Sequence, residues 1–255
     1  QTSCGFHSRR WADAFEACCA EHLDAVPATF VAPLAPDAAD IGRVAEGEAC
    51  ARALDELDAA VGERSLVVRV DRIELSKNIR RGFLAYDHML RAHPEWRGRV
   101  VFAAHVYPSR EGVPAYRRYR EAVDATVAEV NDRWGTGDWT PIRHEASDDY
   151  PASMAALGRA DAVLVNPVRD GLNLVAQEAM LVSERDAVLA LSRGAGSHDA
   201  LGGPDAALTV DAYDVVAAGE TLHRALAMPA DERRARAATL RSRIAERTPA
   251  RWLTD

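Results

Sequence analysis

Short apolar runs alternate with amphipathic segments along most of this sequence. Five runs have the near-continuous apolar character of buried strands: LVVRV (66–70), VVFAAHV (100–106), DAVLVNPV (161–168), AVLALS (187–192) and ALTVD (207–211). A weaker sixth strand is expected at TPIRHE (140–145). Strands of this kind are typical of parallel sheets that are covered on both faces.

Helical periodicity separates these runs, at residues 79–94, 113–135, 149–160, 214–228 and 230–247. In the first segment, apolar residues recur at helical spacing from Ile79 through Phe83 to Leu90, and Pro94 ends the pattern. Strands that alternate with helices predict an α/β fold with a doubly wound parallel sheet.

The first 65 residues have a different pattern. It predicts a helix from about Arg10 to Leu23, a strand-like TFVAPLAP (29–36), and a helix from about Ile41 to Val61. We expect 1–36 to be the tail of another lobe, 37–65 a linker and helix, 66–240 a Rossmann-like domain, and 241–255 a helix returning toward that lobe. The chain starts without Met, so we expect it to be part of a longer protein.

Composition narrows the class of protein. Hydrophobic residues make up 48% of the 255 residues and charged residues 27%, the profile of a soluble globular protein. The net charge of −8 argues against nonspecific nucleic-acid binding. No apolar run approaches the roughly 18–20 residues that cross a bilayer, so no membrane partner is expected. The four cysteines match no zinc pattern and are interpreted as reduced thiols of a cytoplasmic protein.

The first candidate site follows the strand at 66–70, in VDRIELSKN. Arg72 and Lys77 lie in a strand-to-helix loop, where ligands bind in open parallel sheets. Both cations would reach one pyrophosphate beside a helix N-terminus. The alternative is that they are solvated cations paired with Glu74 or Asp71.

The second candidate is NPVRDGLNLVAQE, after the strand that begins at 161. Gly171 permits close backbone approach, and the amides of Leu172, Asn173 and Leu174 would be unpaired in a first helical turn that holds phosphate. Glu178 would accept bonds from ribose hydroxyls. The alternative makes Asp170 a helix N-cap and Glu178 a surface residue.

A third strand end carries Arg110 in YPSREGVPAY, with His105 nearby. A lone histidine there is more often structural than catalytic. The glycine-rich GAGSHDALGG (194–203) is a weak dinucleotide fingerprint but fits a loop near a ligand. HExxH, GxSxG and Walker motifs are absent, which argues against a metalloprotease, an α/β-hydrolase and a P-loop NTPase. Cations at three strand ends together favour an anionic ligand.

Four motifs in order resemble the trehalose-6-phosphate synthase family of retaining glycosyltransferases, glycosyltransferase family 20: VDRIELSKNI, YPSREGVPAY, NDRWGTGDWTPI and NPVRDGLNLVAQE. The resemblance runs from about Gly5 to the end. It implies the two-lobed GT-B fold, with this chain as the Rossmann-like lobe that binds the nucleotide-sugar donor.

The resemblance also implies roles for individual residues. Arg72 and Lys77 would bind the donor pyrophosphate, Asp170 the sugar hydroxyls, Glu178 the ribose, and Arg110 the phosphate of the acceptor, glucose 6-phosphate. The backbone that lines the phosphate and sugar would come from Gly171, Leu172, Asn173, Leu174 and Val175.

The implied reaction transfers glucose from UDP- or GDP-glucose to glucose 6-phosphate and gives trehalose 6-phosphate. It would need no metal or other cofactor, because cations and backbone amides stabilise the leaving diphosphate. SKN stands where many members have SKG, a variant similar to the actinobacterial branch that includes the pseudo-glycosyltransferase validoxylamine 7′-phosphate synthase. Three alternatives stay open. The nucleotide of the donor is UDP or GDP. The enzyme could instead couple a nucleotide-cyclitol to an amino-cyclitol phosphate, or the chain could be a non-catalytic nucleotide-binding module. Whether the protein forms a homo-oligomer is also open.

Overall fold

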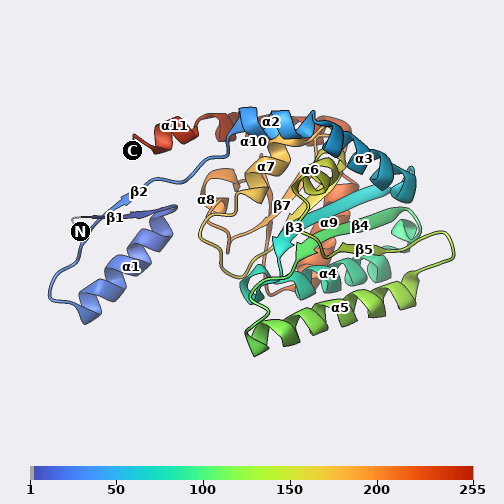
Figure 1. Cartoon of the computed structure of the whole chain (residues 1–255), viewed down its shortest axis with the longest axis horizontal. Helices are drawn as coiled ribbons and strands as arrows, with labels where there is room; N and C mark the ends of the chain where they lie inside the picture. Colours follow the sequence, from blue (N-terminus) through green and yellow to red (C-terminus); the bar gives the residue numbers. More distant parts are fainter. Residues whose placement is uncertain (1–2, 255) are drawn as a thin grey trace.

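A computed structural model describes residues 3–254 and places a six-stranded parallel sheet at the centre of the molecule (Figure 1). The strand order is β5-β4-β3-β6-β7-β8. The strands are β3 (Ser65–Arg72), β4 (Val100–Tyr107), β5 (Ile142–Glu145), β6 (Ala162–Val165), β7 (Val188–Ser192) and β8 (Leu208–Val210). The predicted strands and the doubly wound α/β fold are confirmed. The order reverses between β3 and β6, which is where open α/β sheets bind ligands.

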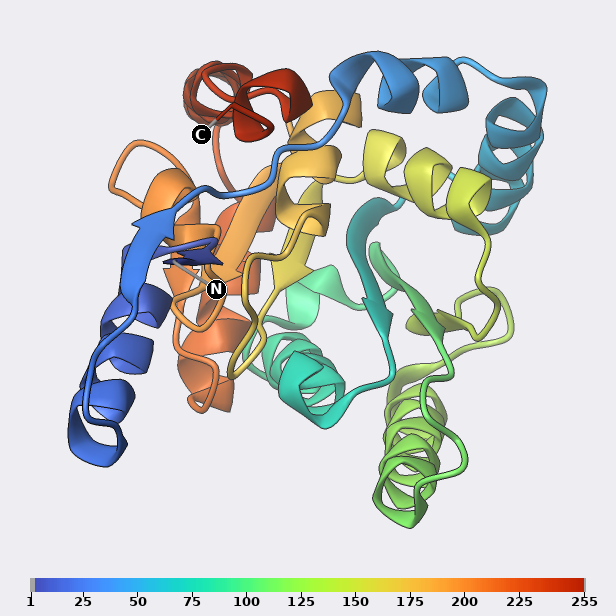
Figure 2. The ribbon, with the colours of Figure 1, turned by 60° about the vertical axis from the view of Figure 1, so that its left-hand side comes forward.

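Helices cover both faces of this sheet, as Figures 1 and 2 show. One face carries α4 (Ile79–Ala92), α5 (Pro114–Trp134) and α9 (Val215–Leu226). The other carries α3 (Glu48–Val61), α6 (Tyr150–Arg159), α7 (Val175–Val182), α2 (Ala38–Ala45) and α10 (Ala230–Ala245). This double cover explains why the strands read as continuous apolar runs. Fully buried side chains such as Phe83, Tyr86 and Phe102 form the core between α4 and the sheet.

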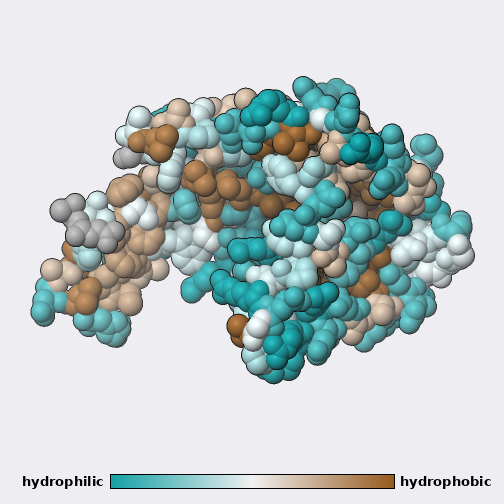
Figure 3. Space-filling model, in the orientation of Figure 1, coloured by the Kyte–Doolittle hydropathy of each residue, from teal (hydrophilic) through white to brown (hydrophobic). Residues whose placement is uncertain are grey.

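The N-terminal segment forms a separate unit beside the main sheet (Figure 2). It contains β1 (Ser3–Phe6), α1 (Arg9–His22) and β2 (Ala28–Val31), and the two strands pair in parallel. The sequence did not predict β1, and the strand-like run at 29–36 is regular only to Val31. The surface of this N-terminal unit is more apolar than the surface of α5 (Figure 3). The proposed domain boundaries remain a prediction.

The prediction of one continuous helix from Ile41 to Val61 was wrong, because the structure has two helices there, α2 and α3. Gly47 is the N-cap of α3, and the chain turns there through a bond from its amide to the carbonyl of Val44. At the other end of the chain, α11 (Pro249–Trp252) follows α10, and the indole of Trp252 donates a 3.0 Å bond to the carbonyl of Ala32.

Two short 3-10 helices complete the described elements, η1 (Leu75–Lys77) and η2 (Pro94–Trp96), together with the short helix α8 (His198–Leu201). None of the helices in residues 3–254 combines the length and apolar character that crossing a bilayer requires.

Candidate functional site

A pocket of about 510 Å³ opens at the carboxyl ends of β3 and β6, where the strand order reverses. Its walls include every predicted donor-binding residue: Arg72, Lys77, Asp170, Gly171, Leu172, Asn173, Leu174, Val175 and Glu178. These residues come from the end of β3 and from η1, and from the loop before α7 and α7 itself, which are far apart in sequence. The structure therefore brings the first and second candidate sites together in one cleft.

Lys77 lines this pocket and is the last residue of η1. Its Nζ atom lies 2.8 Å from Oδ2 of Asp170 and 3.1 Å from Oδ1 of Asp71. Burial lowers the pKa of Lys77, but the two carboxylates outweigh burial and raise it above the ordinary value. The side chain is 14% exposed, so a fixed positive charge faces the pocket. Lys77 is also the only lysine among the 31 lysine and arginine residues of the sequence, which already sets this position apart.

A buried arginine, Arg69, binds the backbone of Lys77, and the sequence did not predict this contact. Arg69 is fully buried, and its Nη2 atom lies 2.7 Å from Oδ2 of Asp71 and 3.1 Å from the carbonyl of Lys77. A Cβ atom at Gly82 would collide with this guanidinium, so the glycine in α4 makes room for it. Arg69 therefore fixes both Asp71 and the backbone of Lys77.

The loop before α7 differs from its prediction. Leu172, Asn173 and Leu174 do not form a helical turn, because α7 begins at Val175 and Asn173 has a left-handed backbone with φ of 74°. Asp170 is not the cap either: the side chain of Asn173 accepts the amide of Ala176 at 3.1 Å.

The anion-binding capacity predicted for this loop is nevertheless present. Among the described residues, no acceptor pairs with the backbone amides from Leu172 to Val175, and all four residues line the pocket. Free amides beside an ammonium group are suited to hold phosphate oxygens.

The glycine-rich segment after β7 braces this loop. The amide of Asp170 donates to Gly194, and the amides of Gly196 and Ser197 donate to Asp170 and Leu172. Cβ atoms at Gly194 or Gly196 would collide with the backbone of the loop that they support. This segment is thus a support rather than a dinucleotide fingerprint.

Asn78 adopts a left-handed conformation with φ of 59°, a conformation that glycine and asparagine adopt more readily than other residues. Its Nδ2 atom donates to the carbonyls of Asn166 and Ala212, at 3.0 and 2.7 Å. Asn78 therefore ties the loop after β3 to the loops after β6 and β8.

Glu178 and Arg72 both line the pocket. Glu178 is half-buried, and this burial raises the pKa of its carboxyl group. Tyr150 is close by, since burial and then the charge of Glu178 raise its pKa. The side chain of Arg72 is 52% exposed, and its Nη1 atom lies 3.4 Å from Oε1 of Glu74. In this structure Arg72 is therefore a paired surface cation, as the alternative interpretation predicted.

Arg110 does not line this pocket. It is exposed in the loop after β4, with φ of 51°, and its Nη1 atom donates to the hydroxyl of Tyr116 at 3.1 Å. The structure therefore leaves Arg110 outside the group formed by Lys77 and Asp170.

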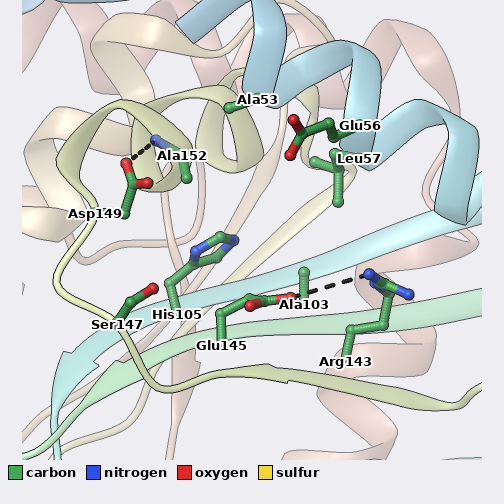
Figure 4. Close-up of a pocket in the computed structure, with 10 residues that line it drawn as sticks. All are labelled: Ala53, Glu56, Leu57, Ala103, His105, Arg143, Glu145, Ser147, Asp149 and Ala152. Atoms are coloured by element: carbon green, nitrogen blue, oxygen red, sulfur yellow. Dashed lines mark hydrogen bonds and ion pairs between the residues drawn. The ribbon is translucent and has the colours of Figure 1, made fainter. Parts of the chain in front are cut away.

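A second pocket, of about 180 Å³, lies over β4 and β5 beneath α3 and α6 (Figure 4). His105 points into it below Asp149, and Ser147 and Glu145 line the side toward β5. Burial lowers the pKa of His105 more than the carboxylates of Glu145 and Asp149 raise it. Among the described residues its Nε2 atom has no hydrogen-bond partner.

The sequence pattern described as Glycosyltransferase family 20 matches residues 1–255. The chain belongs to glycosyltransferase family 20. A curated member, the bifunctional trehalose-6-phosphate synthase/phosphatase of Thermoproteus tenax, is 37% identical over 203 residues, which cover 78% of this chain and 27% of that protein. The resemblance drawn from the four motifs is therefore confirmed at the level of the family.

Solved structures of this family agree with the fold. A UDP-forming trehalose-phosphate synthase from Burkholderia xenovorans, in complex with glucose-6-phosphate, has a TM-score of 0.92 at 26% identity and covers 99% of this chain and 60% of its own. An E. coli structure bound with UDP-2-fluoro glucose has a TM-score of 0.90 at 27% identity, covering 99% and 59%. The chain thus spans 27% of the Thermoproteus tenax protein and 60% and 59% of the two solved chains.

Proposed function

We propose that this chain is the donor-binding lobe of a retaining glycosyltransferase that moves glucose from a nucleotide-glucose to glucose 6-phosphate, giving trehalose 6-phosphate. The observation that carries the proposal is the single pocket where Lys77 meets the unpaired amides of Leu172 to Val175. Related proteins described as trehalose-phosphate synthases support it, with glucose-6-phosphate in one structure and a UDP-sugar analogue in another.

In this proposal each group acts on one part of the donor. Lys77 and Arg72 contact the pyrophosphate together with the free amides, Asp170 contacts the sugar hydroxyls, and Glu178 contacts the ribose. Donor binding exchanges the contact between Lys77 and Asp170 for contacts to phosphate and sugar. Arg110 serves the acceptor phosphate from the neighbouring loop after β4.

The chemistry follows from the fixed charge in the pocket. As the glycosidic bond to the diphosphate breaks, negative charge grows on the leaving oxygen, and Lys77 and the amides stabilise it without reorganising. The acceptor hydroxyl attacks from the same face and gives its proton to the leaving phosphate, so the configuration is retained. This route assigns no step to a metal ion.

We propose that the base lies toward the second pocket. That pocket is built on β4 and β5, and β5 is two strands from β3, a separation of about 10 Å at a strand spacing of about 4.8 Å. Such a separation suits a nucleoside whose diphosphate lies at Lys77.

The relatives described as UDP-forming favour UDP-glucose, and GDP-glucose is the alternative donor. The cysteines Cys4, Cys18, Cys19 and Cys50 are free thiols, which supports a cytoplasmic reaction.

Two measurements test the proposal. Calorimetry of this chain with UDP and GDP tests the donor site, and failure of both nucleotides to bind would contradict it. Transfer is tested in a polypeptide that joins this chain to an acceptor lobe, by the formation of trehalose 6-phosphate. The expected activity requires both lobes, so turnover by this chain alone would contradict the proposed division of labour.

A further inference from the structure

Two histidines and a glutamate come together on the side of the molecule away from the donor pocket. His93 follows the last residue of α4, Glu95 lies in η2, and His223 lies in the last turn of α9. η2 precedes β4, whereas the donor pocket lies at the carboxyl ends of the strands. The cluster therefore occupies the opposite edge of the sheet and shares no residue with that pocket.

The spacing of these groups suits a metal ion. Oε1 of Glu95 lies 3.6 Å from Nδ1 of His93 and 3.9 Å from Nδ1 of His223, and one ligand atom from each residue falls within 4.8 Å of the others. A tetrahedral ion with bonds of about 2.0–2.2 Å separates its ligand atoms by roughly 3.3–3.6 Å. The ligand atoms must therefore move toward one another when the ion binds. The two rings stack with centroids 3.6 Å apart, so binding also requires each ring to turn about its Cβ–Cγ bond.

The far side of His93 is arranged as in metal-bound histidines. Its Nε2 atom lies 2.9 Å from Oε2 of Glu220, whose other oxygen is 3.4 Å from Nε2 of His88. A carboxylate on one ring nitrogen holds the proton there and leaves the lone pair of the other nitrogen for a ligand. The free nitrogen, Nδ1, is the atom that faces Glu95.

His223 presents a lone pair as well. The indole Nε1 of Trp96 donates to Nδ1 of His223 at 3.0 Å, so this nitrogen acts as an acceptor. A metal ion would take the place of the indole proton.

We propose that His93, Glu95 and His223 bind one divalent transition-metal ion, with Glu220 as the positioning residue for His93. Two imidazoles and a carboxylate favour Zn²⁺ and its neighbours Co²⁺, Ni²⁺ and Cu²⁺ over Mg²⁺ or Ca²⁺. The side chains of His93 and His223 are 21% and 30% exposed, so water can complete the coordination. The ion would clamp η2 to α9.

The test uses the chain freed of metal by a chelator and titrated with Zn²⁺ and with Co²⁺. We expect one ion per chain and the visible absorption of tetrahedral Co²⁺. His223→Ala and Glu95→Gln should remove this binding. Glu220→Gln should weaken it roughly 10–100-fold, the usual effect of losing the partner of a metal-bound histidine. His22→Ala changes an exposed histidine on α1 and is the matched control that should bind normally.

Three results would overturn the site. They are no saturable binding by the wild-type chain, unchanged binding by His223→Ala and Glu95→Gln, and a thiolate-to-cobalt charge-transfer band, which would place the ion on cysteine. Circular dichroism of each variant checks that it is folded, and Glu95→Gln alters only a half-exposed carboxylate. Binding of UDP should be the same with and without Zn²⁺, so this test does not depend on the proposed transferase activity.

Discussion

Lys77 and Asp170 form a 2.8 Å ion pair in the proposed donor pocket, although 93 positions separate them in sequence. The pair joins the loop after β3 to the loop after β6. A diphosphate that binds Lys77 must compete with Asp170 for the same ammonium group. Asp170 therefore has two opposite effects in the proposed enzyme, because it favours the sugar and opposes the diphosphate alone.

Asp170→Asn should separate these two effects. Without the competing charge, we expect UDP to bind more tightly by about 1 kcal/mol, the order of one polar contact. UDP-glucose should gain less than UDP, because the amide is a weaker acceptor for sugar hydroxyls. Calorimetry with both ligands measures the difference, and a variant that binds UDP more weakly than wild type would refute the competition.

Lys77→Ala should weaken UDP binding by about 1.5–3 kcal/mol, the range for a lost bond to a charged group. Arg118→Ala removes an exposed cation from α5 and is the control that should leave affinity unchanged. Because its carboxylate partners raise the pKa of Lys77, the ammonium stays charged through neutral pH, and its own contribution to affinity should not change there. Lys77 is the only lysine, so protection of its amine by UDP against an acylating reagent offers a direct check.

Glu178→Gln should stabilise the protein at neutral pH. Burial raises the pKa of Glu178, so the folded state disfavours its charged form, and the free energy of unfolding falls as pH rises from the ordinary carboxyl value through the raised one. Glutamine carries no such charge. Its advantage in melting temperature should therefore shrink toward about pH 4, near the ordinary glutamate pKa.

The same variant should bind uridine and UDP more weakly by similar factors, because both ligands carry the ribose. A melting difference that is constant across pH, or a loss confined to UDP, would argue against this reading of Glu178.

The strands and the two main loops of the donor pocket could be predicted because they depend on local sequence. Apolar runs mark the strands, and cations that follow parallel strands meet at one edge of the sheet. Arg69 could not be assigned in the same way. It stands inside the run LVVRV, and its burial depends on Asp71 and on a glycine in α4 that no local pattern connects to it.

Capping was harder to predict than strand position. Asp170 and Asn173 are both good caps by residue type, and only the left-handed turn at Asn173 decides between them. β1 was missed because it is four residues long and its partner, β2, begins 25 positions later, at Ala28.

Arg69 and Gly82 should show strong coupling. Arg69→Met leaves Asp71 buried with only Lys77 as an ionic partner, and we expect a loss of about 3 kcal/mol, the lower end for a broken buried pair. Gly82→Ala should cost about 1–3 kcal/mol, because the new methyl group meets the guanidinium.

In the double variant that collision is gone, and alanine is the better helix former by up to about 1 kcal/mol. The second substitution should then be neutral or stabilising. Urea denaturation of the four proteins measures the coupling, and simple additivity of the two losses would show that Gly82 does not accommodate Arg69.

Asn78→Gly and Asn78→Ala form a matched pair that isolates the left-handed backbone of Asn78. Both variants lose the same bonds to the carbonyls of Asn166 and Ala212, so this loss cancels in their comparison. Alanine alone carries the penalty of a Cβ atom at φ of 59°, which costs about 1–2 kcal/mol. The Asn78→Ala variant should therefore unfold at a lower urea concentration than the Asn78→Gly variant. It should also bind UDP more weakly, because Lys77 directly precedes the strained residue. Equal stability of the two variants would mean that the loop relaxes to another conformation, and that the left-handed backbone does not restrict which residue can stand at position 78.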